Sequence, residues 1–210
     1  MAKEAPTRRV EPRKLPSRKS SRERVDAILN ATRELIAKDG LETLNTNQIA
    51  EHAGIPIGSV YQYFPNKQAI VYALVQDYLT ELEARIEAFP MEKHLKKGLN
   101  HALKMMSRTV TAPSTFAYER KLGRILLSAM DLYPELRELS DAHVEFCADS
   151  AVQHLQLAGS KWSVERLRKL GRYILEVRRT IYYAPEEIMP DAIRWQEAAT
   201  IAVISQCFED

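Results

Sequence analysis

The sequence lacks the features that mark several large classes of protein. Only 7 of its 210 residues are glycine and 10 are proline, which excludes a collagen-like or glycine-rich fibre. The two cysteines, Cys147 and Cys207, form neither a disulfide framework nor a Cys-x-x-Cys zinc pair, and we expect reduced thiols. No apolar run approaches the roughly 18 residues of a membrane-spanning helix. Residues 1–21 also lack the apolar core of a secretion signal, so we expect a cytoplasmic protein without a membrane partner.

The motifs of the common enzyme classes are missing as well. There is no glycine-rich phosphate loop, no Gly-x-Ser-x-Gly turn and no His-Glu-x-x-His pair. Carboxylates are scattered at the spacing of solvated helix surfaces. The sequence therefore predicts a protein that is not an enzyme, with no catalytic residue, no resident metal and no cofactor.

Charge is distributed unevenly along the chain. Residues 1–25 hold nine Lys and Arg against three Glu, a net charge of +6, so the other 185 residues carry −4 of the total of +2. Residues 1–21 contain three prolines and almost no large apolar side chains, which predicts a flexible basic arm. A basic arm on a mildly acidic body indicates a polyanionic partner at one end, or simply a solvated tail.

Helical spacing of apolar residues dominates the rest of the chain. Ala, Leu, Glu, Arg and Ile are abundant, and no strand pattern or repeat is evident. We expect an all-α fold of about nine helices, with Thr46 as the N-cap of the second and Asn66 of the fourth. The predicted helices span residues 21–39, 47–53, 57–64, 67–89, 92–111, 114–131, 134–157, 163–183 and 190–208.

The first three helices have the proportions of a helix-turn-helix unit. Residues 48–52 and 58–64 form two short helices joined through Gly54-Ile55-Pro56. Val60 and Phe64, four residues apart, serve the inner face of the second short helix. This leaves Ile57, Ser59, Tyr61, Gln62 and Tyr63 outward or at the rim. Glutamine pairs with adenine, hydroxyls bind phosphate and apolar groups meet thymine methyls, so this face predicts DNA recognition.

Residues 27–74 resemble the DNA-binding domain of the tetracycline-repressor (TetR) family. The resemblance is carried by Ile49-Ala50, Ala53-Gly54, the run from Gly58 to Phe64, and Asn66-Lys67, and also by Ile28, Ala31, Gly40, Thr46 and Ile70. It implies an N-terminal three-helix helix-turn-helix domain, residues 22–68, followed by a C-terminal helical ligand-binding and dimerisation domain, residues 69–210. It further implies a homodimeric regulator, most simply a repressor, released from a palindromic double-stranded DNA operator by a small-molecule effector.

The resemblance assigns DNA contacts to individual residues. Thr46, Tyr61 and Lys67 would bind phosphate. Asn47 stands where the family more often has an apolar residue, which places it at the DNA backbone. The base edges or sugars would be approached by Ile57, Gly58, Ser59, Gln62 and Tyr63, with Gly58 allowing the backbone to come close.

The C-terminal domain yields weaker signals. No spacing among its polar candidates, which include Arg120 and Arg178, identifies an effector. The expected ligand-binding residues are His101, Met106, Phe116, Tyr118, Arg124, His143, Phe146, Tyr173, Ile174 and Val177. The last two helices are apolar on more than one side, which indicates burial against a second copy. The competing interpretation is that the last helix is the central helix of a monomeric core. The expected dimer interface comprises Leu167, Leu170, Ala198, Ile201, Ala202 and Ser205.

An alternative function remains open within the class of regulators. His143, Cys147, Ser150 and His154 lie at offsets of 0, 4, 7 and 11 and therefore share one helix face. His and Cys four residues apart can bind zinc or copper, so His143, Cys147 and His154 are candidates for a metal or redox sensor. The competing interpretation is that Cys147 packs as a small apolar residue and the histidines line the core.

Overall fold

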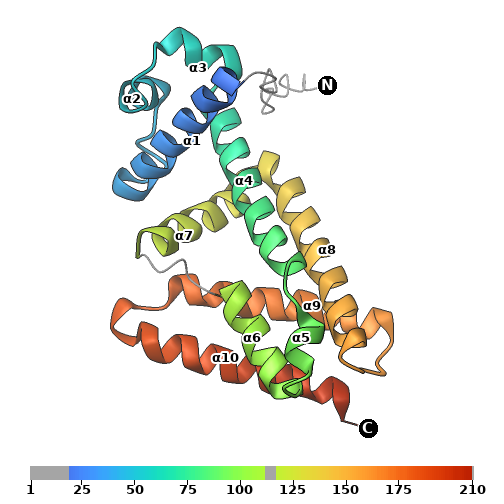
Figure 1. The fold of residues 1–210 in the computed structure, drawn as a ribbon. Coiled ribbons are helices and arrows are strands. Elements are labelled where there is room, and N and C mark those ends of the chain that lie inside the picture. Colours follow the sequence, from blue (N-terminus) through green and yellow to red (C-terminus); the bar gives the residue numbers. More distant parts are fainter. Residues whose placement is uncertain (1–18, 112–116, 210) are drawn as a thin grey trace, which may run out of the picture. The chain divides into compact units, whose positions relative to one another are not determined.

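The computed structural model describes residues 19–111 and 117–209, and all regular structure in these ranges is helical (Figure 1). The predicted all-α fold is confirmed. Contacts divide the described chain into two compact units, the first up to Tyr78 plus Ile125–Arg137 and the second comprising Leu79–Arg124 and the residues from Glu138 onward. The helices α4 (Lys67–Glu87), α7 (Ala117–Leu132) and α8 (Pro134–Leu157) each contribute residues to both units.

The first unit is built on α1 (Lys19–Asp39), α2 (Thr46–His52) and α3 (Ile57–Tyr63), which gather with the start of α4 (Figure 1). Its core side chains come from all four helices, and Ile28, Ile49 and Val60 are completely buried. Gly54 turns the chain between α2 and α3 with a φ of 65°, a conformation in which a Cβ would be strained. This turn fixes the two short helices as the sequence predicts.

The second unit contains one more α-helix than the sequence predicted. The segment 92–111 was expected to be a single helix, but it forms α5 (Met91–Leu95) and α6 (Leu99–Thr111). The break lies at Gly98, whose φ of 102° takes the chain out of the right-handed helix. Position 98 therefore ends one helix, and the prediction of one continuous helix was wrong.

The remaining elements are α9 (Val164–Arg179), α10 (Met189–Ser205) and three short 3₁₀ turns, Thr180–Tyr183, Glu186–Ile188 and Gln206–Phe208. α6 and α9 both pack on α10 (Figure 1). Leu103, Leu167 and Ile204, one from each of these helices, belong to a single apolar cluster. No helix in the described ranges is long and apolar enough to cross a membrane.

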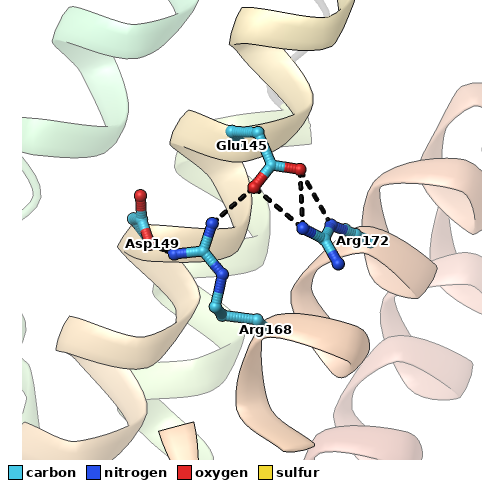
Figure 2. Close-up of polar contacts among 4 residues, drawn as sticks. All are labelled: Glu145, Asp149, Arg168 and Arg172. Atoms are coloured by element: carbon cyan, nitrogen blue, oxygen red, sulfur yellow. Dashed lines mark hydrogen bonds and ion pairs between the residues drawn. The ribbon is translucent and has the colours of Figure 1, made fainter. Parts of the chain in front are cut away.

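Two features join α8 to α9. Gly171 lies directly against α8, where an added Cβ would stand 2.8 Å from the Cβ of Ala151. At the surface, Glu145 accepts from Arg172 Nη2 at 2.7 Å and from Arg168, which also pairs with Asp149 (Figure 2). The Arg172 and Arg168 hydrogen bonds hold the pKa of the Glu145 carboxyl below its ordinary value. The network orients α9 on α8, although its exposure limits its contribution to stability.

Candidate functional site

The start of α2 is capped by a residue that the sequence analysis did not choose. The Asn45 side chain accepts from the backbone N–H of Gln48 at 3.0 Å, and the Gln48 side chain accepts from the backbone N–H of Asn45 at 3.2 Å. This reciprocal pair is a capping box. Thr46 is therefore the first helical residue, and the prediction that Thr46 is the N-cap was wrong.

Because Thr46 is not the N-cap, its hydroxyl can contact α3 instead. Its Oγ1 lies 3.0 Å from the hydroxyl oxygen of Tyr61, within hydrogen-bond distance. Tyr61 is 43% exposed, which is high for an aromatic residue, and the neighbouring Asn47 is exposed as well. Two hydroxyl groups from different helices thus stand together at the surface, where each can bind an anionic oxygen.

The outer side of α3 carries most of the predicted base-reading residues. Ile57, Gly58 and Gln62 are exposed and Ser59 is half-buried. Tyr63 departs from the prediction, because only 6% of it is exposed and it belongs to the core with Val60 and Phe64. The outward placement of Tyr63 was wrong: it lies three residues after Val60, so it faces the interior.

The start of α4 holds the predicted basic contact. Asn66 Oδ1 accepts from the backbone N–H of Ala69 at 2.8 Å, which confirms Asn66 as the capping residue. The Lys67 ammonium donates to the carbonyl oxygen of Leu41 at 3.4 Å. An ammonium has three donor hydrogens, so this contact positions Lys67 without exhausting its capacity to bind phosphate.

The predicted effector residues that the structure describes differ widely in their exposure and contacts. Arg124 is exposed and Tyr173 is 56% exposed. His101 Nε2 lies 3.3 Å from Nδ1 of His94, which stacks on Phe89 with ring centroids 5.1 Å apart. Met106 and Ile174 pack against the apolar cluster, and Val177 is half-buried. Phe116 lies outside the described residues, as does the side chain of Tyr118.

His143 and Phe146 do lie together, on α8. Their ring centroids are 6.4 Å apart, and His143 Nδ1 is 2.8 Å from Glu83 Oε1. His143 is 5% exposed, and burial lowers its pKa despite the opposing effect of the Glu83 hydrogen bond. The neutral imidazole is therefore favoured at this position.

The metal or redox alternative gains no support from this geometry. Cys147 Sγ lies 3.5 Å from His143 Nε2, but burial raises the pKa of its thiol to about 11, and thiolate is the reactive and metal-binding form. His154 instead makes its polar contacts with Ser150, 2.8 Å from its carbonyl oxygen. In the described ranges, no three His, Cys, Asp or Glu side chains are arranged to hold a metal ion.

The predicted dimer residues fall into two groups. Leu167 is completely buried and Leu170 is 8% exposed, both within the core of their own chain, so their assignment to the interface was wrong. Both lie on the inner side of α9, and the sequence pattern alone did not separate inner from outer apolar residues. Ala198 and Ala202 are exposed, and Ile201 and Ser205 are half-buried. The 60% exposed Trp195 shares the face of Ala198, Ala199 and Ala202.

Sequence signals were present for three of the missed residues. Asn45 and Gln48 have the Asn-x-x-Gln spacing of a capping box, which precedes the apolar pair Ile49-Ala50. Trp195 lies three and seven residues before Ala198 and Ala202, the spacing of one helix face. Glu83, the partner of His143, gave no comparable signal because the two residues are far apart in sequence.

Comparison with known proteins identifies the first unit. Residues 28–74 match the family of bacterial regulatory proteins named for tetR. The fatty acid metabolism regulator protein of Bacillus subtilis is 32% identical over 79 residues, which are 38% of this chain and 41% of that protein. The transcriptional repressor KstR of Mycolicibacterium smegmatis is 39% identical over 69 residues, 33% of this chain and 32% of that protein. The matches thus span less than half of these relatives.

Solved structures extend the likeness to the whole fold. A transcriptional regulator from Rhodococcus sp. RHA1 superposes with a TM-score of 0.70 and 16% identity, covering 87% of this chain and 96% of that one. GusR of Salmonella enterica also gives a TM-score of 0.70, with 15% identity, 89% of this chain and 96% of that one. At such identities the likeness establishes the fold alone, including the C-terminal helices.

Proposed function

Since this chain belongs to the tetR family of bacterial regulatory proteins, we propose that it is a DNA-binding transcriptional regulator that acts as a homodimeric repressor. A small-molecule effector bound by the second unit lowers its affinity for a palindromic operator. The observation that carries this proposal is the cluster of exposed hydrogen-bonding groups on α2 and α3, above all the paired hydroxyls of Thr46 and Tyr61. We define Thr46, Asn47, Tyr61, Gln62 and Lys67 as the recognition surface.

The recognition surface offers the two kinds of contact that operator binding requires. The hydroxyls of Thr46 and Tyr61 and the ammonium of Lys67 suit phosphate oxygens, which position a protein on the duplex. Gln62, exposed on α3 beside Gly58, has the donor and acceptor pair that matches an adenine edge in the major groove. Phosphate contacts supply affinity for any sequence and Gln62 supplies preference.

The exposed face of α10 favours a twofold dimer. Trp195, Ala198, Ala199 and Ala202 lie on one side of α10 and are exposed in the single chain. Small alanines permit close approach of a second helix, and a large exposed tryptophan is a common anchor of interfaces. A twofold dimer presents two copies of α3, which is why a palindromic operator is expected.

One of the two named relatives supports repression as the direction of regulation. KstR is described as a transcriptional repressor and the Bacillus subtilis protein as a regulator of fatty acid metabolism. The family match covers residues 28–74, a region that includes the recognition surface, so it supports DNA binding. Effector release through α4, whose residues belong to both units, is the corresponding proposal for control.

Selection of bound fragments from genomic DNA tests the proposal. The expected result is one inverted-repeat motif bound by the wild type. Tyr61→Phe removes only the hydroxyl and should weaken binding to all sequences, whereas Gln62→Ala should relax the preference at one base position by about 1–3 kcal/mol. Recovery of no common motif would refute sequence-specific regulation.

Salt dependence separates the charged contacts. Lys67→Ala should lower the slope of log affinity against log salt by about one phosphate contact, and Lys93→Ala, an exposed lysine of the second unit, is the matched control. Deletion of residues 1–18, which lie outside the described residues, should flatten the slope further if the basic arm contacts DNA. An unchanged slope in the deletion variant would show that the arm is a solvated tail that does not contact DNA.

A further inference from the structure

Arg178, in the last turn of α9, is a guanidinium without an acidic partner among the residues that the structure describes. It is half-buried, and its hydrogen bond is donated by Nη2 to the carbonyl oxygen of Ser107 on α6, at 3.4 Å. No carboxylate in the described part of the chain lies within ion-pair distance of it. The adjacent Arg179 makes the comparison clear, because its Nη1 pairs with Glu176 at 3.2 Å and its Nη2 reaches Ser140.

The surroundings of Arg178 strengthen its need for an anion. Burial lowers the pKa of its guanidinium to about 10, so the group is still positively charged at neutral pH but poorly solvated. Its ionisable neighbours are Tyr182 and Cys147, and the pKa of about 11 of the Cys147 thiol keeps that group uncharged. A desolvated cation with no opposing charge is unfavourable, and a bound anion removes this penalty.

The backbone that carries Arg178 is held in place by α10. Gln196 Nε2 donates to the carbonyl oxygens of Val177 at 2.9 Å and Arg178 at 3.1 Å, and lies 3.3 Å from Thr180 Oγ1. Gln196 is itself 9% exposed. The end of α9 is thus fixed before any ligand arrives, which lowers the entropic cost of binding.

The helices next to this guanidinium indicate the rest of the ligand. Arg178 donates to Ser107 of α6 and has Cys147 of α8 as an ionisable neighbour. α6 also carries the half-buried Met105 and Met106, and α8 carries the half-buried Phe146. Met and aromatic side chains adapt to apolar surfaces, whereas a planar guanidinium matches a carboxylate through two parallel hydrogen bonds. The chemistry therefore combines one acidic group with an apolar body.

We propose that Arg178 binds the carboxylate of an acidic effector whose apolar part contacts α6 and α8. This inference rests on the proposed function, in which the second unit receives a small molecule, and it specifies the chemical class of that molecule. Arg120 on α7 is the competing anchor, because its Nη1 is buried and has no hydrogen-bond partner within the described ranges. Arg120 already pairs with Glu186 at 2.6 Å, so its charge is compensated and Arg178 is the stronger anion site.

Thermal denaturation with matched acids and amides tests the proposal without any variant. The probes are acetate, hexanoate and decanoate against acetamide, hexanamide and decanamide, with inorganic phosphate at the same ionic strength as a separate arm. We expect at least one acid to raise the unfolding temperature more than its amide and the longer acids to bind more tightly. Stabilisation by phosphate alone would assign the same anion site to a phosphate-bearing ligand. Equal effects of acids and amides, or no effect of any anion, would overturn the proposal.

Variants then locate the site. Arg178→Gln should weaken binding of the stabilising anion at least tenfold, and Arg178→Lys should retain part of the affinity because it keeps the charge. Arg172→Gln, on the same helix and paired with Glu145, is the matched control and should bind as the wild type does. Loss of binding in Arg120→Gln with full binding in Arg178→Gln would reject Arg178 as the anchor.

DNA binding, measured on the same samples, separates this inference from the proposed function. An anion that binds through Arg178 without changing affinity for the selected operator leaves the site intact and refutes release by this effector. Specific operator binding with no anion site refutes the Arg178 proposal and leaves the DNA-binding regulator standing.

Discussion

The two units differ most in what they bury. In the first unit Thr32 is the one buried polar side chain in the described ranges, and its hydroxyl donates to the carbonyl oxygen of Ile28 one turn earlier. The second unit buries six polar side chains, Ser107, His143, Ser150, His154, Gln196 and Thr200. The first unit thus keeps most of its polar side chains at the surface, which suits the proposed recognition of DNA. The second places polar groups inside, which suits the proposed binding of a small molecule.

The buried polar groups of the two units also differ in how far away in sequence their hydrogen-bond partners lie. A buried polar atom needs a partner, and in the second unit several partners come from distant parts of the sequence, as Glu83 does for His143 and the end of α9 for Gln196. In the first unit the buried Thr32 instead donates within its own helix, to the carbonyl oxygen of Ile28. A local partner can be predicted from spacing along the sequence, whereas a distant partner depends on tertiary packing.

The largest expected effects test whether the two units are separate. Phe64→Ala removes a side chain that is 1% exposed in the first unit and should cost about 3–5 kcal/mol of unfolding free energy. Leu167→Ala removes a completely buried side chain of the second unit at a cost of about 2–5 kcal/mol. Hydrogen exchange should show lost protection in the unit that carries the substitution. Equal loss throughout both units in both variants would contradict the division.

The sequence predicted the first unit better than the second for the same physical reason. Helix ends and turns such as Asn66 and Gly54, and apolar positions such as Ile49 and Val60, follow from local spacing and were predicted correctly. Errors arose where two local rules competed: Thr46 could cap α2, but Asn45 forms the reciprocal box with Gln48.

Tertiary packing accounts for the errors in the second unit. Leu167 and Leu170 carry the same helical pattern whether they face their own core or a partner, so periodicity could not exclude them from the interface. The position of Arg178 next to Ser107 depends on how α9 meets α6, which no spacing along one helix encodes. The residues of a ligand site drawn from several helices are therefore the last to be predicted.

Dimerisation should be lost when a charge is placed on α10. Ala202→Asp buries an unpaired carboxylate in the proposed interface, at a cost of about 3–5 kcal/mol of association free energy. Ala88→Asp places the same charge on an exposed alanine outside α10 and is the control. Analytical ultracentrifugation should show a monomer for Ala202→Asp and a dimer for the control. A wild type that sediments as a monomer at micromolar concentration would contradict the proposal that a dimer presents two copies of α3 to the operator.

Replacing one glycine by alanine in each unit should change the stability of the two units in opposite directions. Gly171→Ala forces α9 away from α8, since the new Cβ would meet Ala151 at 2.8 Å and the Cα of Ala148 at 3.0 Å. We expect a loss of about 1–3 kcal/mol of unfolding free energy in the second unit, measured by chemical denaturation. Wild-type stability in Gly171→Ala would show that the two helices are packed less tightly than described.

Gly58→Ala should stabilise the first unit and still weaken DNA binding. Gly58 lies within α3 with open space around the position of a Cβ, so alanine should add up to about 1 kcal/mol through its helix propensity. The added methyl group faces the proposed DNA surface and should lower operator affinity. Equal operator affinity in wild type and variant would show that the backbone at Gly58 does not approach the DNA closely.

The smallest expected effect is a pH dependence that belongs to the second unit. Burial lowers the folded-state pKa of His143 below 6.5, while its hydrogen bond to Glu83 raises it, and the two causes partly cancel. Because the folded pKa lies below the unfolded one, this contribution to stability is fully present above about pH 6.5 and is lost as pH falls through the folded pKa.

His143→Gln, which stays neutral, should therefore flatten the stability profile between about pH 7 and pH 5. Glu83→Gln should steepen it, since the residue that favours protonated His143 is removed and the nearby Arg179 disfavours protonation. Chemical denaturation of the three proteins across this range measures both changes, and a wild type that gains stability on acidification would show that the Glu83 contact outweighs burial.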